Sequence, residues 1–380
     1  MKLNDTYFMA KAIELAEKGR GTTSPNPMVG AVIVKNRSTT GIVGQGYHKK
    51  AGADHAEIVA LKEAGEAADG ATLYVSMEPC CHYGKTPPCT DAIIKSGIKR
   101  VVAAMIDDNP LVNGKGIRIL SDAGITTVTG VLEHRARKLN EAYLKFITTG
   151  LPFVTVKMAT TLDGRIADIR GISSGRCWIS SVGARKRVHE WRAWSDAVMV
   201  GAGTVIADNP RLTVRTQNSK LKIKNLKFKA AGPLRVVVDS TLKTQTNAHV
   251  FDDSNVLIAA TERCDEAKAA ILGKRSIEVL KFTSHEGRVP LGDLLKELGA
   301  RKITSVLCEG GAALATALIR ERLADKLIFV VAPKLLGSGK TVLDDIGIRE
   351  IDCALTLKDI AIEVVEHDTI ISGYPDYTEL

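Results

Sequence analysis

Short apolar runs alternate with amphipathic helix patterns along most of the chain, and this alternation restricts the folds that it can adopt. In the first half, the runs predicted as strands cover residues 29–35, 72–77, 100–106 and 125–130. The predicted helices each end at a glycine and cover residues 5–18, 55–65, 89–97 and 115–123. Glycine often follows a helix because it adopts the left-handed conformation without strain. This alternation predicts a layered α/β domain.

A helix pattern over residues 132–150 closes the first half, and Leu151-Pro152 then restarts the chain. A length of 380 residues suggests two or three domains at about 150 residues each. We therefore expect two domains, residues 1–147 and residues 152–380.

The second half repeats the α/β alternation with different motifs. Its predicted strands cover residues 153–158, 196–201, 234–239, 255–260, 303–308 and 326–331. Its predicted helices cover residues 182–194, 264–272, 290–298 and 312–323. The glycine-rich Rossmann fingerprint does not follow the first of these strands, which argues against a Rossmann domain. The lysine-rich stretch 216–231 fits either a basic edge hairpin or a solvated loop.

Composition and charge narrow the class of protein. Hydrophobic residues make up 45% of the sequence and charged residues 25%, as in ordinary globular proteins. The net charge of +9 suits either an anionic ligand or simply a basic surface. Seven cysteines do not make a disulfide framework in a chain this long, and neither a signal peptide nor a transmembrane run is recognisable. We therefore expect the protein to lie in the reducing cytoplasm and to have no membrane partner.

Two short motifs point to a metal centre. His55-Ala56-Glu57 is followed 22 residues later by a segment that starts at Pro79 and contains Cys80 and Cys89. One histidine and two cysteines leave a fourth position open, which is the arrangement of a catalytic zinc site. A glutamate beside such ligands serves as a proton shuttle in zinc deaminases. His55 and Cys89 both start predicted helices, whose N-termini would stabilise thiolates and a bound hydroxide.

Two neighbouring side chains leave an alternative open. Cys81 and His82 directly follow Cys80, and His82 as a fourth ligand would close the coordination shell into a structural site. Cys81 is more simply a small buried thiol.

The first half resembles the deaminase half of the bifunctional riboflavin-biosynthesis deaminase–reductases. The resemblance rests on PNPMVGAV (25–32), GQGYH (44–48), HAE (55–57), EPCCHYGKTPPC (78–89) and DDNPLVNGKG (107–116). It implies a cytidine-deaminase-like three-layer α/β/α domain in which His55, Cys80 and Cys89 bind zinc and Glu57 is the proton shuttle. It also implies that five residues contact the substrate: Asn26, His48, His82, Lys85 and Asn109. Of these, His48 and Lys85 would bind its phosphate.

The second half resembles the reductase half of the same family, which has a dihydrofolate-reductase-like α/β fold. The matching segments are KMATTLDGRIA (157–167), VGAGTVIADNPRLTVR (200–215), VVVDS (236–240) and CEGGAALATAL (308–318). The resemblance implies that NADPH contacts Ala159, Trp178, Thr204, Asp208, Ser240, Gly311, Ala312, Ala313, Leu314, Ala315, Thr316 and Ala317. It implies that the substrate contacts Arg192, Leu212, Arg215 and Glu309, and it places Lys157 and Asp163 beside the nicotinamide.

The chain departs from the family pattern at one place. Residues 165–177 form a longer connection than usual, and Arg176 stands where the family has a substrate-binding serine. Arg176, Ser173 and Ser174 are the alternatives for that contact.

The expected function has two steps on a small pyrimidine ribosyl phosphate. The first half would hydrolytically deaminate 2,5-diamino-6-ribosylamino-4(3H)-pyrimidinone 5′-phosphate, and the second would use NADPH to reduce 5-amino-6-(5-phosphoribosylamino)uracil. The alternative from another class is a nucleic-acid-editing deaminase with a basic binding domain, favoured by the charge and opposed by the NADPH-type motifs and the 4% of aromatic residues. A non-enzymatic zinc-stabilised module leaves Glu57 without a purpose. We expect no nucleic-acid partner and leave a homo-oligomer open.

Overall fold

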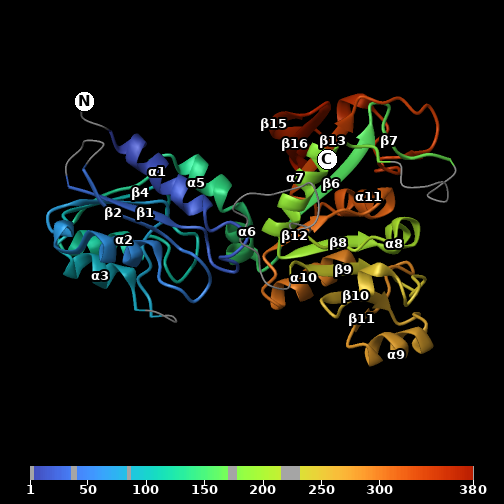
Figure 1. Ribbon diagram of the computed structural model, residues 1–380, viewed down its shortest axis with the longest axis horizontal. Helices are drawn as coiled ribbons and strands as arrows, with labels where there is room; N and C mark the ends of the chain where they lie inside the picture. Colours follow the sequence, from blue (N-terminus) through green and yellow to red (C-terminus); the bar gives the residue numbers. More distant parts are fainter. Residues whose placement is uncertain (1–3, 36–40, 84–86, 170–177, 215–231, 380) are drawn as a thin grey trace. The chain divides into compact units, whose positions relative to one another are not determined.

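The computed structural model describes residues 4–35, 41–83, 87–169, 178–214 and 232–379. The chain forms two compact units, Met1–Gly150 and Leu151–Leu380, and Figure 1 labels the elements of each. Within the described residues, no helix is both long and apolar enough to cross a membrane.

The first unit alternates strands and helices much as its sequence predicts. Its elements are α1 (Asp5–Glu17), β1 (Gly30–Val34), β2 (Ile42–Tyr47), α2 (Ala56–Ala64), β3 (Thr72–Val75), α3 (Cys89–Lys95), β4 (Arg100–Ala103), α4 (Lys115–Asp122), β5 (Thr126–Val128), α5 (Glu133–Leu139) and α6 (Glu141–Thr149). The strands form one sheet in the order β2-β1-β3-β4-β5.

Helices cover both faces of this sheet, so the expected three-layer α/β/α architecture is confirmed. Successive residues of β1 alternate between two cores because side chains on a strand point to opposite faces. Ala31 and Ile33 pack with α2, α3 and α4, whereas Val32 and Val34 pack with α1, α5 and α6. Figure 1 shows α1 and α5 on one side of the strands and α2 and α3 on the other.

A single helix over residues 132–150 was expected, but the structure breaks it in two. The break is at Asn140, where the backbone leaves the helical conformation between α5 and α6. The Asn140 side chain accepts the N–H of Met28 at 2.8 Å and donates to the carbonyl of the same residue at 3.0 Å. These long-range bonds fix Asn140 outside the helical pattern, which the local sequence does not reveal.

The second unit also contains every helix and strand that its sequence predicts. Its elements are β6 (Phe153–Thr161), β7 (Arg165–Ala167), α7 (Val182–Trp194), β8 (Ala197–Gly201), α8 (Ala202–Asp208), β9 (Leu234–Val238), β10 (Val256–Thr261), α9 (Glu266–Lys274), β11 (Glu278–Phe282), α10 (Leu291–Ala300), β12 (Ser305–Cys308), α11 (Ala312–Arg320), β13 (Lys326–Ala332), β14 (Lys340–Thr341), β15 (Leu357–Val365) and β16 (Asp368–Pro375). Sequence analysis missed α8, β7, β11 and the C-terminal strands. The lysine-rich stretch 216–231 lies outside the described residues.

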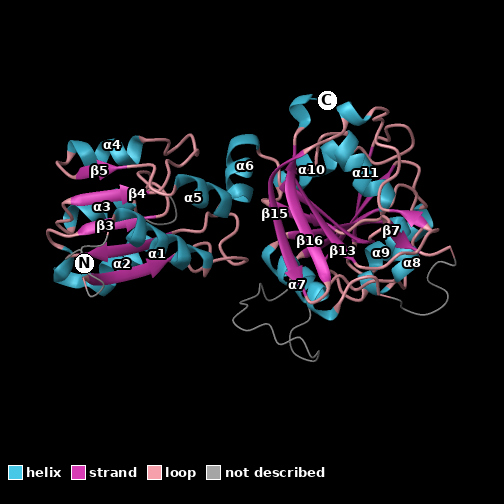
Figure 2. Cartoon of the chain, turned by 90° about the horizontal axis from the view of Figure 1, so that it is seen from above, coloured by secondary structure: helices cyan, strands magenta, loops and turns pink. Residues whose placement is uncertain are grey.

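A nine-stranded sheet with the order β11-β10-β9-β8-β12-β6-β13-β16-β15 organises this unit. The strands from β11 to β13 are parallel, and β16 and β15 add antiparallel. Figure 2 shows β13, β16 and β15 side by side. Helices α10 and α11 cover one face, and α7 and α9 cover the other.

The strand order reverses direction beside β8, and this reversal marks a ligand-binding edge. From β8 the chain moves outward through β9, β10 and β11, then returns to place β12 between β8 and β6. In open α/β sheets, ligands bind at such a switch point, at the carboxyl ends of the strands. The segments after β8, β9 and β12 carry Thr204, Ser240 and Glu309.

Candidate active sites

Three side chains in the first unit form a potential metal centre. His55 is the N-cap of α2, Cys89 is the first residue of α3, and Cys80 lies in the loop that follows β3. The Nδ1 atom of His55 lies 3.5 Å from Cys80 Sγ and 3.3 Å from Cys89 Sγ. All three ligand atoms lie within 4.8 Å of one another.

This donor set fits zinc. Tetrahedral coordination with ordinary Zn–N and Zn–S bonds places the nitrogen and sulfur atoms about 3.6 Å apart, which agrees with the observed separations. Among the described residues, the metal-binding group contains His55, Cys80 and Cys89 and does not include His82. Cys81 points elsewhere, with its Sγ 3.9 Å from the carbonyl oxygen of Leu111. The geometry therefore favours an open three-ligand centre over the closed alternative.

Of the two thiols, only Cys80 loses its proton readily. A hydrogen bond from Cys89 lowers the pKa of Cys80 to about 4, and the Cys89 backbone N–H also donates to Cys80 Sγ at 3.4 Å. The same thiol pair raises the pKa of Cys89, because Cys89 keeps the shared proton. A dication that takes both sulfurs displaces this proton, so metal binding is coupled to proton release.

Glu57 lies in the first turn of α2 and is 3% exposed. Burial, followed by the charge of Cys80, raises the pKa of Glu57 to about 7, although the nearby His55 opposes this shift. A carboxyl group whose pKa is near neutrality can both accept and return a proton. Its position beside the ligands, and not among them, suits a proton shuttle.

A glycine on β2 allows α2 to approach closely enough to place these groups. A Cβ atom on Gly46 would lie 2.6 Å from the carbonyl oxygen of Ala56 and 2.6 Å from Val59 Cβ. Contacts this short require a backbone shift. The GQGYH motif therefore contributes to the site by setting the position of the helix that carries Glu57.

His48 and Asn26 contact each other beside the metal ligands. Asn26 Nδ2 donates to His48 Nε2 at 3.1 Å, and His48 Nδ1 donates to the carbonyl of Asp54 at 3.1 Å. Burial lowers the pKa of His48, and its ring packs edge-on against His55 at 5.3 Å between centroids. A neutral ring with both nitrogens engaged favours a role in holding Asn26 and the Asp54 backbone over direct phosphate binding.

Glu78, a residue to which the sequence assigned no role, holds in place the loop that carries Asn109. The carboxylate of Glu78, which is 4% exposed, accepts the backbone N–H groups of Asp107 at 3.2 Å, Gly114 at 2.9 Å and Ile117 at 3.1 Å. Glu78 stands two residues before Cys80, so it ties this loop to the metal-ligand segment. An acidic residue directly before the Pro-Cys pair was the available signal.

The remaining candidates in this unit are His82 and Lys85. His82 is half-buried, and its buried Nδ1 atom has no hydrogen-bond partner among the described residues. An imidazole nitrogen in this state is suited to a ligand. Lys85 lies outside the described residues, so its predicted phosphate contact stays a prediction.

In the second unit, the segments at the carboxyl ends of β8 and β12 are joined. Thr204 Oγ1 accepts the backbone N–H of Gly311 at 3.0 Å, at the N-terminus of α11. A Cβ atom on Gly311 would lie 3.4 Å from Thr204 Oγ1, which is an ordinary van der Waals contact. Ser240 follows β9, and its hydroxyl accepts the N–H of Val289 at 3.2 Å. Open helix N-termini at this edge suit a dinucleotide phosphate.

The side chains of the predicted cofactor segment 311–317 differ in burial. The side chains of Ala312, Leu314, Ala315 and Thr316 are buried, and Leu314 and Ala315 belong to the core between α11 and the sheet. Thr316 Oγ1 accepts the N–H of Asp344 at 2.8 Å. A helix turns successive residues to different sides, so seven consecutive side chains do not face one ligand. Ala313 is exposed, and Gly311 and Ala317 are half-buried. The contact of NADPH with the segment 311–317 stays a prediction.

Arg192 and Glu309, predicted separately as substrate contacts, bind each other. Arg192 Nε and Nη2 donate to the two Glu309 oxygens at 2.5 and 2.8 Å, and Nη1 donates to the carbonyl of Thr213 at 3.3 Å. Burial opposes the charge on Arg192, but Glu309 raises its pKa; Arg192 in turn lowers the pKa of Glu309. Much of the Arg192 guanidinium is thus occupied within the protein.

The other predicted ligand contacts differ in exposure. Trp178 is exposed, with the Arg185 guanidinium 4.8 Å from its ring centroid, whereas Ala159 is half-buried on β6. Asp208 is the exposed last residue of α8. Leu212 is 3% exposed and packs in the core, and its predicted substrate contact stays a prediction. Arg176 and Arg215, with Ser173 and Ser174, lie outside the described residues.

Lys157 and Asp163 also have different environments. Burial lowers the pKa of Lys157, which lies on β6 near the charges of Glu309, Arg192 and Asp208. Asp163 accepts hydrogen bonds from the N–H of Gly337 at 2.6 Å and from the Thr161 hydroxyl at 2.6 Å, which suits a structural role. Lys157 therefore lies with the predicted substrate residues, and Asp163 anchors a loop.

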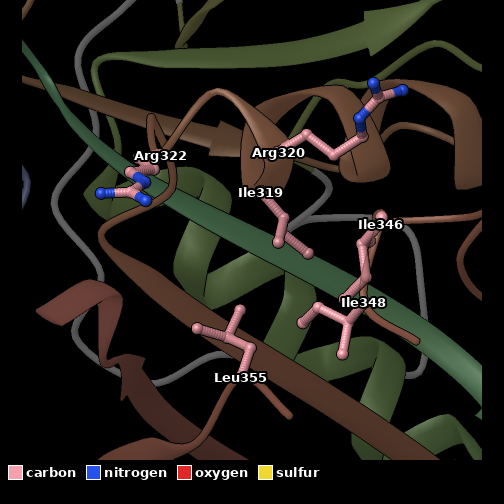
Figure 3. A pocket seen from close by; sticks show the side chains of 7 residues that line it. Ile319, Arg320, Arg322, Ile346, Ile348 and Leu355 are labelled. Atoms are coloured by element: carbon pink, nitrogen blue, oxygen red, sulfur yellow. The ribbon is translucent and has the colours of Figure 1, made fainter. Parts of the chain in front are cut away.

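A separate pocket lies at the other end of α11. Apolar side chains from α11 and the following segments point toward one another there, with two arginines around them (Figure 3). The lining residues are Ile319, Arg320, Arg322, Ile346, Gly347, Ile348 and Leu355. A nine-residue helix is about 13 Å long, so this pocket is distant from the open N-terminus at Gly311.

A three-layer α/β/α unit with a His-Cys-Cys centre and a buried glutamate defines the zinc-dependent deaminase class. The comparisons with known proteins agree. Residues 2–105 match the cytidine and deoxycytidylate deaminase zinc-binding region, and residues 152–371 match the RibD C-terminal domain.

Relatives match over nearly the full chain. The riboflavin biosynthesis protein RibD of Aquifex aeolicus is 41% identical over 97% of this chain and 97% of its own length. The Escherichia coli RibD protein is 42% identical over 88% of this chain and 89% of its own. The solved structure of Acinetobacter baumannii RibD, form 1, is 39% identical with a TM-score of 0.85, covering 98% of this chain and 99% of its own.

The chain belongs to the RibD family of riboflavin biosynthesis proteins. It is a bifunctional enzyme with a zinc-dependent deaminase domain and an NADPH-dependent reductase domain of dihydrofolate-reductase-like fold. The basic nucleic-acid-binding domain of the alternative interpretation is therefore wrong, because the second half is a reductase domain.

Proposed function

We propose that the chain performs two consecutive reactions on one pyrimidine ribosyl phosphate. The related Thermotoga maritima protein, 35% identical with a TM-score of 0.79 over 98% of this chain and 99% of its own, is described as a diaminohydroxyphosphoribosylaminopyrimidine deaminase and 5-amino-6-(5-phosphoribosylamino)uracil reductase. We assign the same pair of substrates to this chain, with deamination in residues 1–147 and reduction in residues 152–380. The observation that carries the proposal is the close His55–Cys80–Cys89 group beside Glu57.

For deamination, His55, Cys80 and Cys89 would hold zinc. When bound, zinc supplies a water molecule of lowered pKa as the nucleophile. Glu57 accepts the proton that this water loses and delivers protons to the ring nitrogen and to the departing ammonia. Asn26 and Asn109 orient the pyrimidine, together with His48 and His82, and Lys85 binds the phosphate.

For reduction, NADPH supplies the hydride. The chain's own task is to position cofactor and ribose. Thr204 and Gly311, which are hydrogen-bonded to each other at the start of α11, contact the cofactor together with the segment Ala312–Ala317. Ala159, Trp178, Asp208 and Ser240 are the other cofactor contacts. Arg192 and Glu309 act as one ion-paired unit at the substrate, and Arg215 is the remaining guanidinium for the ribose phosphate.

A coupled assay on the full chain tests this order of reactions. With the diaminopyrimidine ribosyl phosphate and no NADPH, ammonia is released and one equivalent of deaminated product accumulates. With NADPH, oxidation follows only after that product is present. With the diaminopyrimidine substrate, NADPH oxidation that starts without deamination would contradict the proposal, as would ammonia release by a zinc-free chain.

We also propose that both reactions occur in the cytoplasm. The zinc site depends on two free thiols, which a reducing compartment preserves. The proposed partner is the small pyrimidine phosphate alone, without nucleic acid or membrane, and the chain functions as either a monomer or a homo-oligomer.

A further inference from the structure

Residues 106–151 lie between the two matched family regions, which end at residue 105 and begin at residue 152. This interval contains α5 and α6, which lie on the α1 side of the sheet. Three of its side chains, at spacings of three residues, hold loops that carry proposed substrate contacts; they are Arg137, Asn140 and Tyr143.

Asn140 holds the loop that carries Asn26. Its side-chain amide pairs with both backbone groups of Met28, at 2.8 and 3.0 Å, as a neighbouring strand would. Asn140 is 2% exposed, so both bonds are shielded from water. Met28 is two residues from Asn26, and the fixed backbone at Met28 therefore limits where the Asn26 amide can point.

Tyr143 holds the loop that carries Asn109. Its hydroxyl lies 3.0 and 3.1 Å from the two Asp107 carboxylate oxygens, and the same carboxylate accepts the Asn109 N–H at 3.0 Å. Tyr143 is 9% exposed and Asp107 is 7% exposed. Arg137 adds an ion pair to Asp108 at 2.6 Å, but this pair is partly exposed and contributes less.

We propose that α5 and α6 act as a substrate-loop clamp, in which Asn140 and Tyr143 are positioning residues for the deaminase reaction. The clamp connects the two loops to one helical segment and thereby fixes the separation between Asn26 and Asn109. A pyrimidine that must contact both loops then binds without first ordering them, which lowers the entropic cost of binding. This inference rests on the proposed function, in which Asn26 and Asn109 contact the substrate.

The test uses the full chain and the variant Tyr143→Phe, which keeps the buried ring and removes only the hydroxyl. Tyr74→Phe is the matched control, because Tyr74 is also a buried tyrosine whose hydroxyl donates to a carboxylate, that of Asp5 at 2.8 Å. Asp5 lies on neither substrate loop. Both variants therefore lose a hydrogen bond from a tyrosine to a carboxylate, at different places in one domain. Asp5 also keeps its ion pair with Arg100 at 2.8 Å.

Loss of a hydrogen bond to a buried carboxylate corresponds to about tenfold or more in an equilibrium constant. For Tyr143→Phe we expect KM for the diaminopyrimidine ribosyl phosphate to rise about tenfold, with kcat nearly unchanged and full zinc content. For Tyr74→Phe we expect an unchanged KM. Amide hydrogen exchange without substrate provides a second measurement, in which the segment around Asn109 exchanges faster in Tyr143→Phe than in Tyr74→Phe.

Two further variants separate this inference from the function on which it rests. If Asn26→Ala and Asn109→Ala raise KM while Tyr143→Phe and Asn140→Ala do not, the clamp is wrong and the substrate contacts stand. If Asn26→Ala and Asn109→Ala leave KM unchanged, the proposed contacts themselves are wrong. An equal KM increase in Tyr74→Phe would also overturn the clamp, because the effect would then reflect general destabilisation.

Discussion

At the scale of single residues, Glu57 is the group whose environment is most closely linked to chemistry. Burial raises its pKa to about 7, and it stands beside the ligands without belonging to the three-residue group. Glu57→Gln preserves size and removes the proton carrier, so we expect deamination to fall by a factor of about 100 to 10,000 with zinc retained. Metal analysis beside the ammonia assay checks this; zinc loss in parallel with activity would make Glu57 a ligand.

The cysteines give a second prediction at this scale. Cys80→Ser and Cys89→Ser each remove one ligand and should lose zinc and deaminase activity together. Cys81→Ser should retain both, because Cys81 Sγ points toward the carbonyl of Leu111. Zinc content after dialysis distinguishes the three variants, and equal loss from Cys81→Ser would favour a different ligand set.

Which residues were predictable depends on how far apart the partners lie in the sequence. His55, Cys80 and Cys89 were predicted as zinc ligands because they stand in two short local motifs, HAE (55–57) and EPCCHYGKTPPC (78–89). The Arg192–Glu309 pair was not, because 117 residues separate its members and only the sheet order brings them together. Leu212 was assigned to substrate, but its apolar side chain is buried in the core.

At the scale of elements, the position of α2 on β2 controls the metal centre. Gly46→Val would place side-chain atoms against the backbone at Ala56, and overpacking of this kind costs about 1–3 kcal/mol. We expect lower stability and weaker zinc binding, since His55 and Glu57 move with the helix. Thermal unfolding and zinc titration measure the two effects; unchanged zinc affinity would show that α2 adapts without moving its first turn.

A loop in the second unit gives a pH prediction. The Thr161 hydroxyl, followed by the Gly337 N–H, lowers the pKa of Asp163 to about 2 from an ordinary value of 3.8. Between these values the unfolded chain binds more protons than the folded one, so stability increases with pH. The contribution of Asp163 is complete above about pH 4 and is lost as pH falls toward 2. The difference in the free energy of unfolding between wild type and Asp163→Asn, measured by urea unfolding, should shrink as pH falls over this range. A constant difference would show that the Asp163 carboxylate does not contribute in this way.

Elements with a clear apolar period were predictable, and those shaped by long-range contacts were not. β2 was missed because its sequence, IVGQGY, contains two glycines, which weaken the strand signal. Those glycines serve the close approach of α2. Likewise, the break between α5 and α6 depends on bonds from Asn140 to Met28, 112 residues away.

At the scale of the whole molecule, the two units have separate cores. Core clusters of the first unit contain residues up to Ile147, and those of the second begin at Leu151. Each unit also has its own main sheet. The chain can therefore lose its deaminase activity and still keep the fold that supports the reductase activity.

Zinc removal from the intact enzyme tests this independence. Among the described residues, the one cluster with metal-ligand geometry is in the first unit, and the proposed reductase residues follow strands of the second. EDTA should therefore abolish ammonia release, while NADPH oxidation with the already deaminated substrate continues at nearly its original rate. Added zinc should restore deamination, which shows that the chain remained folded. Parallel loss of both activities, with recovery of both on zinc addition, would mean that the metal centre also supports the reductase.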